Sequence, residues 1–272
     1  MKKTLAAVVV LSFALAASAA ATPISDNFES YALGTFPSPT WLDAGAVLAD
    51  PRTPIPSATV VATTDAFGNP TQALAIANAV SNSRGIYAPV SISSFYTLTS
   101  DIRIDQYSDH PDGSAADWAM QLTFAQVGVA NFCCTPQAGI YASSFTGTWR
   151  LFVIPAANGT GVDMDLGIPA AVGTWYNVHL DLSVGTATFH SVITDVATGT
   201  VLVNRFDTIA GLLPADMPYD SIAFFGGETA PNDTMADLAV VDNVNIAGTP
   251  EPSTLLLIGS GLSLLAARWR KS

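Results

Sequence analysis

The chain has 272 residues, of which 49% are hydrophobic, and its formal charge at pH 7 is −12. This length and apolar content suffice for one domain with a full core. So large an acidic excess excludes a nucleic-acid-binding protein, because neutralising phosphates requires Lys and Arg. The excess suits a protein that stays soluble outside the cell, or one that binds divalent cations through aspartate oxygens.

The N-terminus has the three parts of a secretory signal peptide. Lys2 and Lys3 precede an apolar stretch at 5–17, and small residues occupy 17–21. Signal peptidase recognises and removes such a segment, so we expect the protein to be exported. We predict that residues 1–21 are the signal peptide and that cleavage follows Ala21, with Ala19 as the alternative.

Strand patterns dominate the middle of the chain. Apolar and polar residues alternate at 95–104, and the same period of two recurs at 117–124, 174–184 and 236–246. A further strand at 186–194 follows directly after Gly185, which predicts a hairpin. No amphipathic helix of convincing length is present. The sequence therefore predicts an all-β domain over 22–249, folded as an antiparallel sandwich or barrel.

Three short segments make this prediction more specific. The domain opens with Asp26-Asn27-Phe28-Glu29-Ser30-Tyr31, continues through Gly173-Thr174-Trp175-Tyr176-Asn177-Val178, and closes with Val241-Asp242-Asn243-Val244. Together the segments resemble the concanavalin A-like fold of the laminin G and legume-lectin type. The resemblance implies an antiparallel jelly-roll sandwich in which the first and last strands lie side by side.

The C-terminus carries a second targeting signal. Pro250-Glu251-Pro252 precedes an apolar run at 254–267, and the basic cluster Arg268, Trp269, Arg270, Lys271 follows. About 14 residues of helix is short for a permanent membrane span, and cations hold the far end on the cytoplasmic side. Residues 250–272 resemble the PEP-CTERM sorting tail of Gram-negative bacteria. The resemblance implies an inner-membrane precursor with a short transmembrane helix, which an exosortase-type enzyme processes for the cell surface or extracellular matrix.

Two groups of aspartates are candidate calcium ligands. The loop at 105–117 is dense in oxygen ligands but lacks the EF-hand order, and a solvated acidic loop would have the same composition. Jelly rolls of this type often hold a structural calcium beside their terminal strands, so the resemblance implies a second site there. One of its carboxylates falls on the apolar phase of its strand and needs a metal, an arginine or backbone donors. The candidate ligands are Asp105, Asp109, Asp112 and Asp117 in the loop, and Asp26 and Asp242 at the terminal strands.

The two cysteines, Cys133 and Cys134, are adjacent. Export permits disulfides, but neighbouring Cα atoms are only about 3.8 Å apart, below the usual disulfide range. The pair is therefore a strained vicinal disulfide, two buried thiols or the source of an intermolecular bridge.

Catalytic patterns are missing from the sequence. Jelly-roll glycosidases resembling this domain use two glutamates on one strand, whereas 22–249 contains only Glu29 and Glu228. The three histidines, at 110, 179 and 190, have no partner at i+4, so the sequence predicts neither a catalytic triad nor a zinc site. We predict no catalytic residue.

Sugar binding needs exposed aromatic faces. Trp118 and Tyr176 are in phase with aliphatic neighbours, which predicts burial. Trp175 and His179 fall on the polar phase of the 174–184 strand, so they are the candidate glycan-binding pair.

The sequence as a whole favours an exported, non-catalytic surface protein that associates with extracellular polysaccharide. Two alternatives stay open: a secreted glycan-active enzyme with an Asp-based site, and a purely structural adhesive domain without a ligand.

Overall fold

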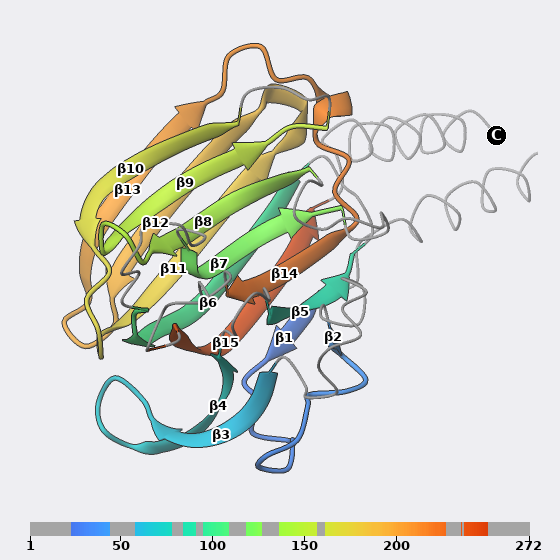
Figure 1. Ribbon diagram of the computed structural model, residues 1–272. Helices are drawn as coiled ribbons and strands as arrows, with labels where there is room; N and C mark the ends of the chain where they lie inside the picture. Colours follow the sequence, from blue (N-terminus) through green and yellow to red (C-terminus); the bar gives the residue numbers. More distant parts are fainter. Residues whose placement is uncertain are drawn as a thin grey trace, which may run out of the picture.

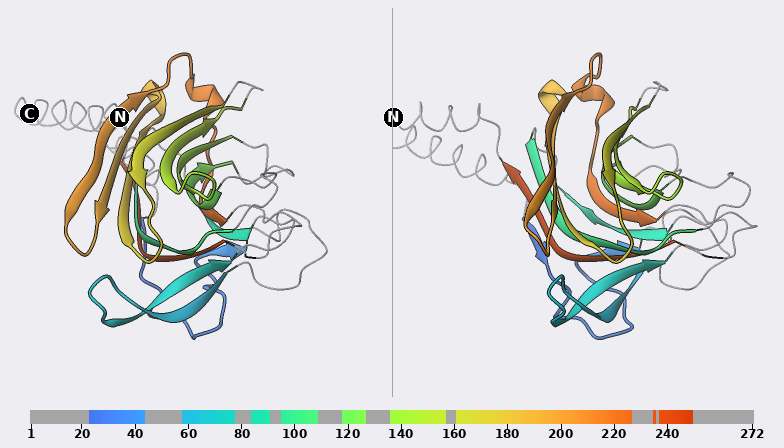
Figure 2. Two further views of the ribbon diagram at one scale, coloured as in Figure 1. Left: turned by 60° about the vertical axis from the view of Figure 1, so that its left-hand side comes forward. Right: turned by 90° about the vertical axis from the view of Figure 1, so that its left-hand side faces the viewer.

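The computed structural model describes residues 23–43, 58–77, 84–90, 95–108, 118–126, 136–156, 161–226, 235 and 237–249. About two thirds of these residues belong to the strands of two antiparallel sheets, which face each other as curved layers (Figures 1 and 2). The predicted all-β antiparallel jelly-roll sandwich is therefore confirmed. The expected signal-peptide and transmembrane helices lie outside the described residues. Within those residues, no helix is long and apolar enough to cross a membrane.

The first sheet has eight strands. In spatial order they are β13 (Thr200–Thr208), β12 (Thr188–Asp195), β11 (Trp175–Ser183), β6 (Phe95–Gln106), β15 (Leu238–Thr249), β4 (Pro70–Ala77) and β3 (Ala58–Thr64), with β1 (Ile24–Asp26) also pairing with β15. We call it the terminal sheet, because it holds the first and last strands of the domain. The β3–β4 hairpin projects from one end of the sandwich (Figure 1).

The second sheet has seven strands. In spatial order they are β10 (Val162–Pro169), β9 (Thr148–Ile154), β8 (Gln137–Ser143), β7 (Trp118–Ala125), β14 (Ser221–Gly226), β5 (Arg84–Pro89) and β2 (Leu42–Asp43). Short 3-10 turns, η2 (Val184–Thr186) and η3 (Pro214–Asp216), lie between strands.

The period-two pattern explains which side chains form the core. In β6 every second side chain, from Tyr96 to Ile104, is buried, and β11 alternates in the same way. The inward side chains of both sheets form one apolar cluster that includes Leu98, Leu122 and Val178. Burying these side chains stabilises the sandwich, and the alternate residues of the terminal sheet are left facing outward.

The two ends of the domain meet as predicted. β1 pairs antiparallel with β15, so that Ile24 lies opposite Ile246 and Asp26 lies opposite Val244. A register irregularity interrupts β15 between Asp242 and Asn245, where Asn243 adopts a left-handed φ of 50°. An extra residue in one strand reverses which face the following side chains occupy.

Candidate ligand-binding face

The register of β15 places Asp26 and Asp242 on opposite faces of the terminal sheet. Asp26 lies opposite Val244, a core residue, and so points inward. Asp242 lies opposite Asp101 on β6, on the side that faces outward. The prediction that Asp26 and Asp242 form one calcium site is therefore wrong, because the irregularity at Asn243 separates their side chains.

Asp26 instead stabilises the N-terminal turn through hydrogen bonds. Its Oδ1 accepts a hydrogen bond from the Phe28 N–H at 2.8 Å, and its Oδ2 accepts bonds from Tyr31 Oη and Trp41 Nε1, each at 2.9 Å. Phe28 and Trp41 are fully buried in the core. A carboxylate that accepts three such donors has a structural role.

Asp242 is a buried carboxyl beside other carboxylates. It is 5% exposed, and its Oδ1 accepts a hydrogen bond of 2.7 Å from the Asn243 N–H. Burial raises the pKa of Asp242 to about 6, and the nearby charges of Asp101 and Glu29 add to this effect. The hydrogen bonds from Asn243 and Thr71 oppose the rise but do not cancel it.

In the predicted calcium loop, the structure describes only the first ligand. Asp105 forms an ion pair with Arg103, and the Nη2–Oδ2 distance is 2.9 Å. Asp109, Asp112 and Asp117 lie outside the described residues, as do Cys133 and Cys134, so the loop site and the vicinal disulfide stay predictions.

Trp175 faces outward but is covered. The side chain is only 6% exposed, because it packs against Ala73 and Val240 while the Arg103 guanidinium lies 4.8 Å above its ring. Its Nε1 donates a hydrogen bond of 3.0 Å to the Thr64 carbonyl. The prediction of an exposed Trp175 ring is wrong, because strand phase gives the direction of a side chain and not what covers it.

His179 is outward and belongs to a cluster that the spacing of residues along one strand does not indicate. The Oδ2 atom of Asp181 is 3.0 Å from His179 Nε2 and 3.0 Å from His190 Nδ1. One ligand atom from each of the three side chains lies within 4.8 Å of the others. Asp181 on β11 lies directly opposite His190 on β12. The signal that could have revealed the cluster is the hairpin register between 175 and 195, and not spacing along one strand.

A second layer of polar side chains surrounds the cluster. Thr97 Oγ1 donates to Asp181 Oδ1 at 2.7 Å, Thr99 Oγ1 lies 2.9 Å from His179 Nδ1, and Asn204 Oδ1 lies 3.0 Å from His190 Nε2. Burial raises the pKa of Asp181, but the hydrogen bonds from Thr97 and the two histidines outweigh it, and the net pKa is lowered.

An exposed aromatic ring adjoins this cluster. Phe206 on β13 is 70% exposed and stacks on the His190 ring, with a centroid separation of 4.0 Å and an interplanar angle of 5°. Because Phe206 lies directly opposite His190, the ring extends the polar face to the outer strand of the sheet. What distinguishes Phe206 from the exposed ring of Phe67 is that it stacks on a histidine within a group of polar side chains.

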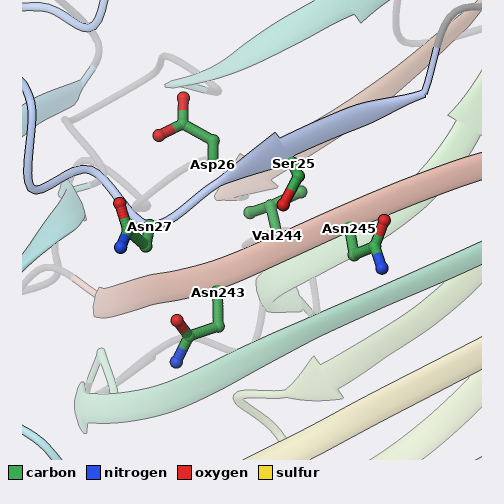
Figure 3. A pocket seen from close by; sticks show the side chains of 6 residues that line it. All are labelled: Ser25, Asp26, Asn27, Asn243, Val244 and Asn245. Atoms are coloured by element: carbon green, nitrogen blue, oxygen red, sulfur yellow. The ribbon is translucent and has the colours of Figure 1, made fainter.

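Polar side chains continue from the cluster across β6 and β15 to β1. Thr99 lies between His179 on β11 and Asn245 on β15, and Asn245 lies opposite Ser25 on β1. A pocket of about 360 Å³ opens there, lined by Ser25, Asp26, Asn27, Asn243, Val244 and Asn245 (Figure 3). We refer to the surface from Phe206 to this pocket as the polar face.

The outward side of the seven-stranded sheet differs from the polar face. Gln121, Thr123, Gln137 and Tyr141 are buried there, whereas Arg150 on β9 forms partly exposed ion pairs with Asp163 and Asp165 on β10. Glu29, the only glutamate among the described residues, accepts hydrogen bonds of 2.7 Å from Thr71 Oγ1 and 2.8 Å from the Gln72 N–H. These hydrogen bonds link the N-terminal turn to β4, so Glu29 has a structural role.

The C-terminal segment matches a known targeting motif. Residues 249–271 match the PEP-CTERM protein-sorting motif, which includes Pro250, Glu251, Pro252, Arg268, Arg270 and Lys271. The motif implies an exported precursor that is anchored at the membrane and processed by an exosortase to the cell surface. None of the curated protein sequences matches the chain.

Solved structures share the fold of the domain. Arcelin-5, a lectin-like defense protein from Phaseolus vulgaris, has a TM-score of 0.53 at 10% identity, over 85% of this chain and 99% of its own. Basic winged bean lectin, solved with Tn-antigen, has a TM-score of 0.51 at 12% identity, over 83% of this chain and 98% of its own. A sialidase has a TM-score of 0.50 at 13% identity, over 85% of this chain but only 19% of its own. At these identities the likeness establishes a lectin-like sandwich and nothing about ligands.

Proposed function

We propose that this exported protein binds extracellular polysaccharide without cleaving it, through the polar face of its terminal sheet. In this proposal signal peptidase removes residues 1–21, and residues 22–249 form the mature domain. Residues 250–272 hold the precursor in the inner membrane until the exosortase-type enzyme acts on them. The lectin-like neighbours and the sorting motif both support a surface protein that contacts glycans.

The observation that carries the proposal is the exposed ring of Phe206, stacked on His190. The C–H groups on one side of a pyranose ring pack well on an aromatic face, whose π electrons carry partial negative charge. His190 holds the ring flat, and Asn204 and Asp181 lie beside it with oxygen atoms that can accept bonds from sugar hydroxyls. One apolar platform with a few placed polar groups is the usual composition of a small-ligand site.

The acidic charge of the chain indicates which class of glycan it binds in this proposal. The formal charge is −12, and all three lysines lie at 2, 3 and 271, outside the proposed mature domain. The polar face itself carries Asp101 and Asp181. An acidic surface repels polymers of uronic acids, so the proposed ligand is a neutral polysaccharide.

Affinity electrophoresis tests this proposal with the full chain in mild detergent. Gels would contain either the neutral or the uronic-acid fraction of the matrix of the producing cells. We expect retardation by the neutral fraction, and we expect Phe206→Ala to weaken it at least about tenfold, or roughly 1.4 kcal/mol. Phe67, which is 69% exposed at the tip of the β3–β4 hairpin, supplies a matched control.

Three outcomes would contradict the proposal. Equal losses in Phe206→Ala and Phe67→Ala would mean that the polar face is not the binding surface. Retardation by neither fraction would favour a structural domain without a ligand. Shortening of the polysaccharide during incubation would favour a glycan-active enzyme.

A further inference from the structure

We propose that His179, Asp181 and His190 form a binding site for a divalent transition metal ion of the zinc class. The ligand atoms are His179 Nε2, His190 Nδ1 and a carboxylate oxygen of Asp181. This inference does not rest on polysaccharide binding, because it concerns a site formed by the chain alone.

The distances suit one ion bound by all three groups. Asp181 Oδ2 is 3.0 Å from each of the two nitrogen atoms, and the three ligand atoms lie within 4.8 Å of one another. Zinc binds nitrogen and oxygen at about 2.0–2.2 Å, so tetrahedral ligands lie roughly 3.2–3.6 Å apart. Small side-chain rotations therefore suffice to bring the ligands onto a metal.

The kinds of ligand decide which ion is bound. Two imidazoles and one carboxylate suit Zn²⁺, Ni²⁺ or Cu²⁺, whereas Ca²⁺ takes six to eight oxygen ligands. Three protein ligands leave a fourth position for water or an incoming donor atom. The side chains are 19–30% exposed, so the fourth position faces solvent.

The partners on the far side of each ligand are the second, independent observation. Asn204 Oδ1 lies 3.0 Å from His190 Nε2, and this contact orients the ring so that Nδ1 is directed at the Asp181 carboxylate. Thr99 Oγ1 contacts the other ring nitrogen of His179, Nδ1. Thr97 Oγ1 donates a hydrogen bond to the other carboxylate oxygen of Asp181, Oδ1. Hydrogen bonds to the far side of metal-binding side chains orient these ligands in proteins.

The backbone also keeps the site rigid. His179 and Asp181 come from β11 and His190 from the neighbouring β12, in continuous antiparallel register. The supporting residues come from β6 and β13, which flank these strands. A site on paired strands is held more precisely than one on loops.

Zinc chloride titration by calorimetry tests the proposal, followed by absorption spectroscopy with Co²⁺. The protein would be the full chain in detergent, without a histidine tag and without polysaccharide. Cys133→Ser and Cys134→Ser would be introduced first, because thiolates also bind zinc. We expect one zinc ion per chain and the strong visible bands of tetrahedral cobalt.

Matched variants locate the binding site. His179→Gln and His190→Gln should each weaken zinc binding about 100-fold or more, and Thr99→Val should weaken it about 10- to 100-fold. His110→Gln alters the third histidine of the chain and should leave zinc binding unchanged. Each variant would be unfolded thermally in excess chelator, so that loss of binding can be separated from loss of folding.

The proposal is overturned if the protein binds no zinc at millimolar concentration. It is also overturned if His110→Gln weakens binding as much as His190→Gln, or if the ligand variants bind as the parent does. None of these results bears on polysaccharide binding, which the electrophoresis measures without added metal.

Discussion

Asp181 on β11 lies directly opposite His190 on β12, and its Oδ2 atom also contacts His179, so that one carboxylate joins both histidines of the polar face. The cluster is outward on a sheet whose inward side at these positions is mostly apolar, with Ser191 as a buried polar exception. An outward cluster contributes little to the core, which leaves its residues available for binding.

Asp26→Ala tests whether the hydrogen bonds of Asp26 stabilise the N-terminal turn. Removal of this carboxylate leaves the Phe28 N–H and the Trp41 Nε1–H without their acceptor, and a buried donor without a partner costs about 1–3 kcal/mol. We expect the free energy of unfolding to fall by about 2–4 kcal/mol in urea titrations.

Asp65→Ala is the control for this change. Asp65 accepts backbone bonds from Phe67 and Asn69, but it lies in an exposed turn where water can replace it. We expect a loss below about 1 kcal/mol. A loss for Asp26→Ala no larger than this would show that the three bonds do not hold the turn.

Asp242→Asn should have an effect that depends on pH. The pKa of Asp242 is raised to about 6 in the folded protein, so its ionised form is disfavoured on folding. This cost is present in full above pH 6 and disappears as the pH falls toward the unfolded pKa near 4. The amide removes the charge and keeps an oxygen that can accept the Asn243 N–H.

Thermal unfolding at pH 8 and pH 4 would measure this effect. We expect Asp242→Asn to stabilise the protein at pH 8 by on the order of 1 kcal/mol, or about 2–4 °C, and to have a much smaller effect at pH 4. Glu29 and Asp101, which face Asp242, are present in both proteins, so the difference isolates one group. Destabilisation at pH 8 would mean that a cation neutralises the carboxylate.

Trp175→Ala should destabilise the fold, because the ring is packed under Arg103 and against Ala73. We expect a loss of about 3 kcal/mol in the free energy of unfolding. Phe67→Ala, which removes an exposed ring, should change it by less than about 0.5 kcal/mol. A loss below about 0.5 kcal/mol for Trp175→Ala would mean that the Trp175 ring is exposed, as strand phase predicted, and can stack on a sugar.

The fold was predictable from the sequence because the alternation of apolar and polar residues indicates which face of each strand is buried. The strands at 95–104 and 174–184 appear as β6 and β11 with nearly these bounds. The pairing of the first and last strands was also predictable, through the likeness of their segments to a known fold.

The site was less predictable because it depends on register between strands. His179 and His190 are neighbours only because Asp181 lies opposite His190, a relationship that no single strand contains. Asp242 shares a sequence phase with Val244, yet the irregularity at Asn243 turns the two side chains to opposite faces. Local sequence gives the direction of a side chain only where the strand is regular, while pairing and covering residues decide what it contacts.

Hydroxyl-radical footprinting tests most directly whether the polar face binds polysaccharide. Oxidation of side chains would be measured by mass spectrometry, with and without the neutral polysaccharide fraction. We predict that Phe206 and His190 become several-fold less reactive, while Phe67 stays unchanged as the internal reference. Unchanged oxidation of Phe206 at a saturating concentration, with protection elsewhere on the domain, would contradict this prediction.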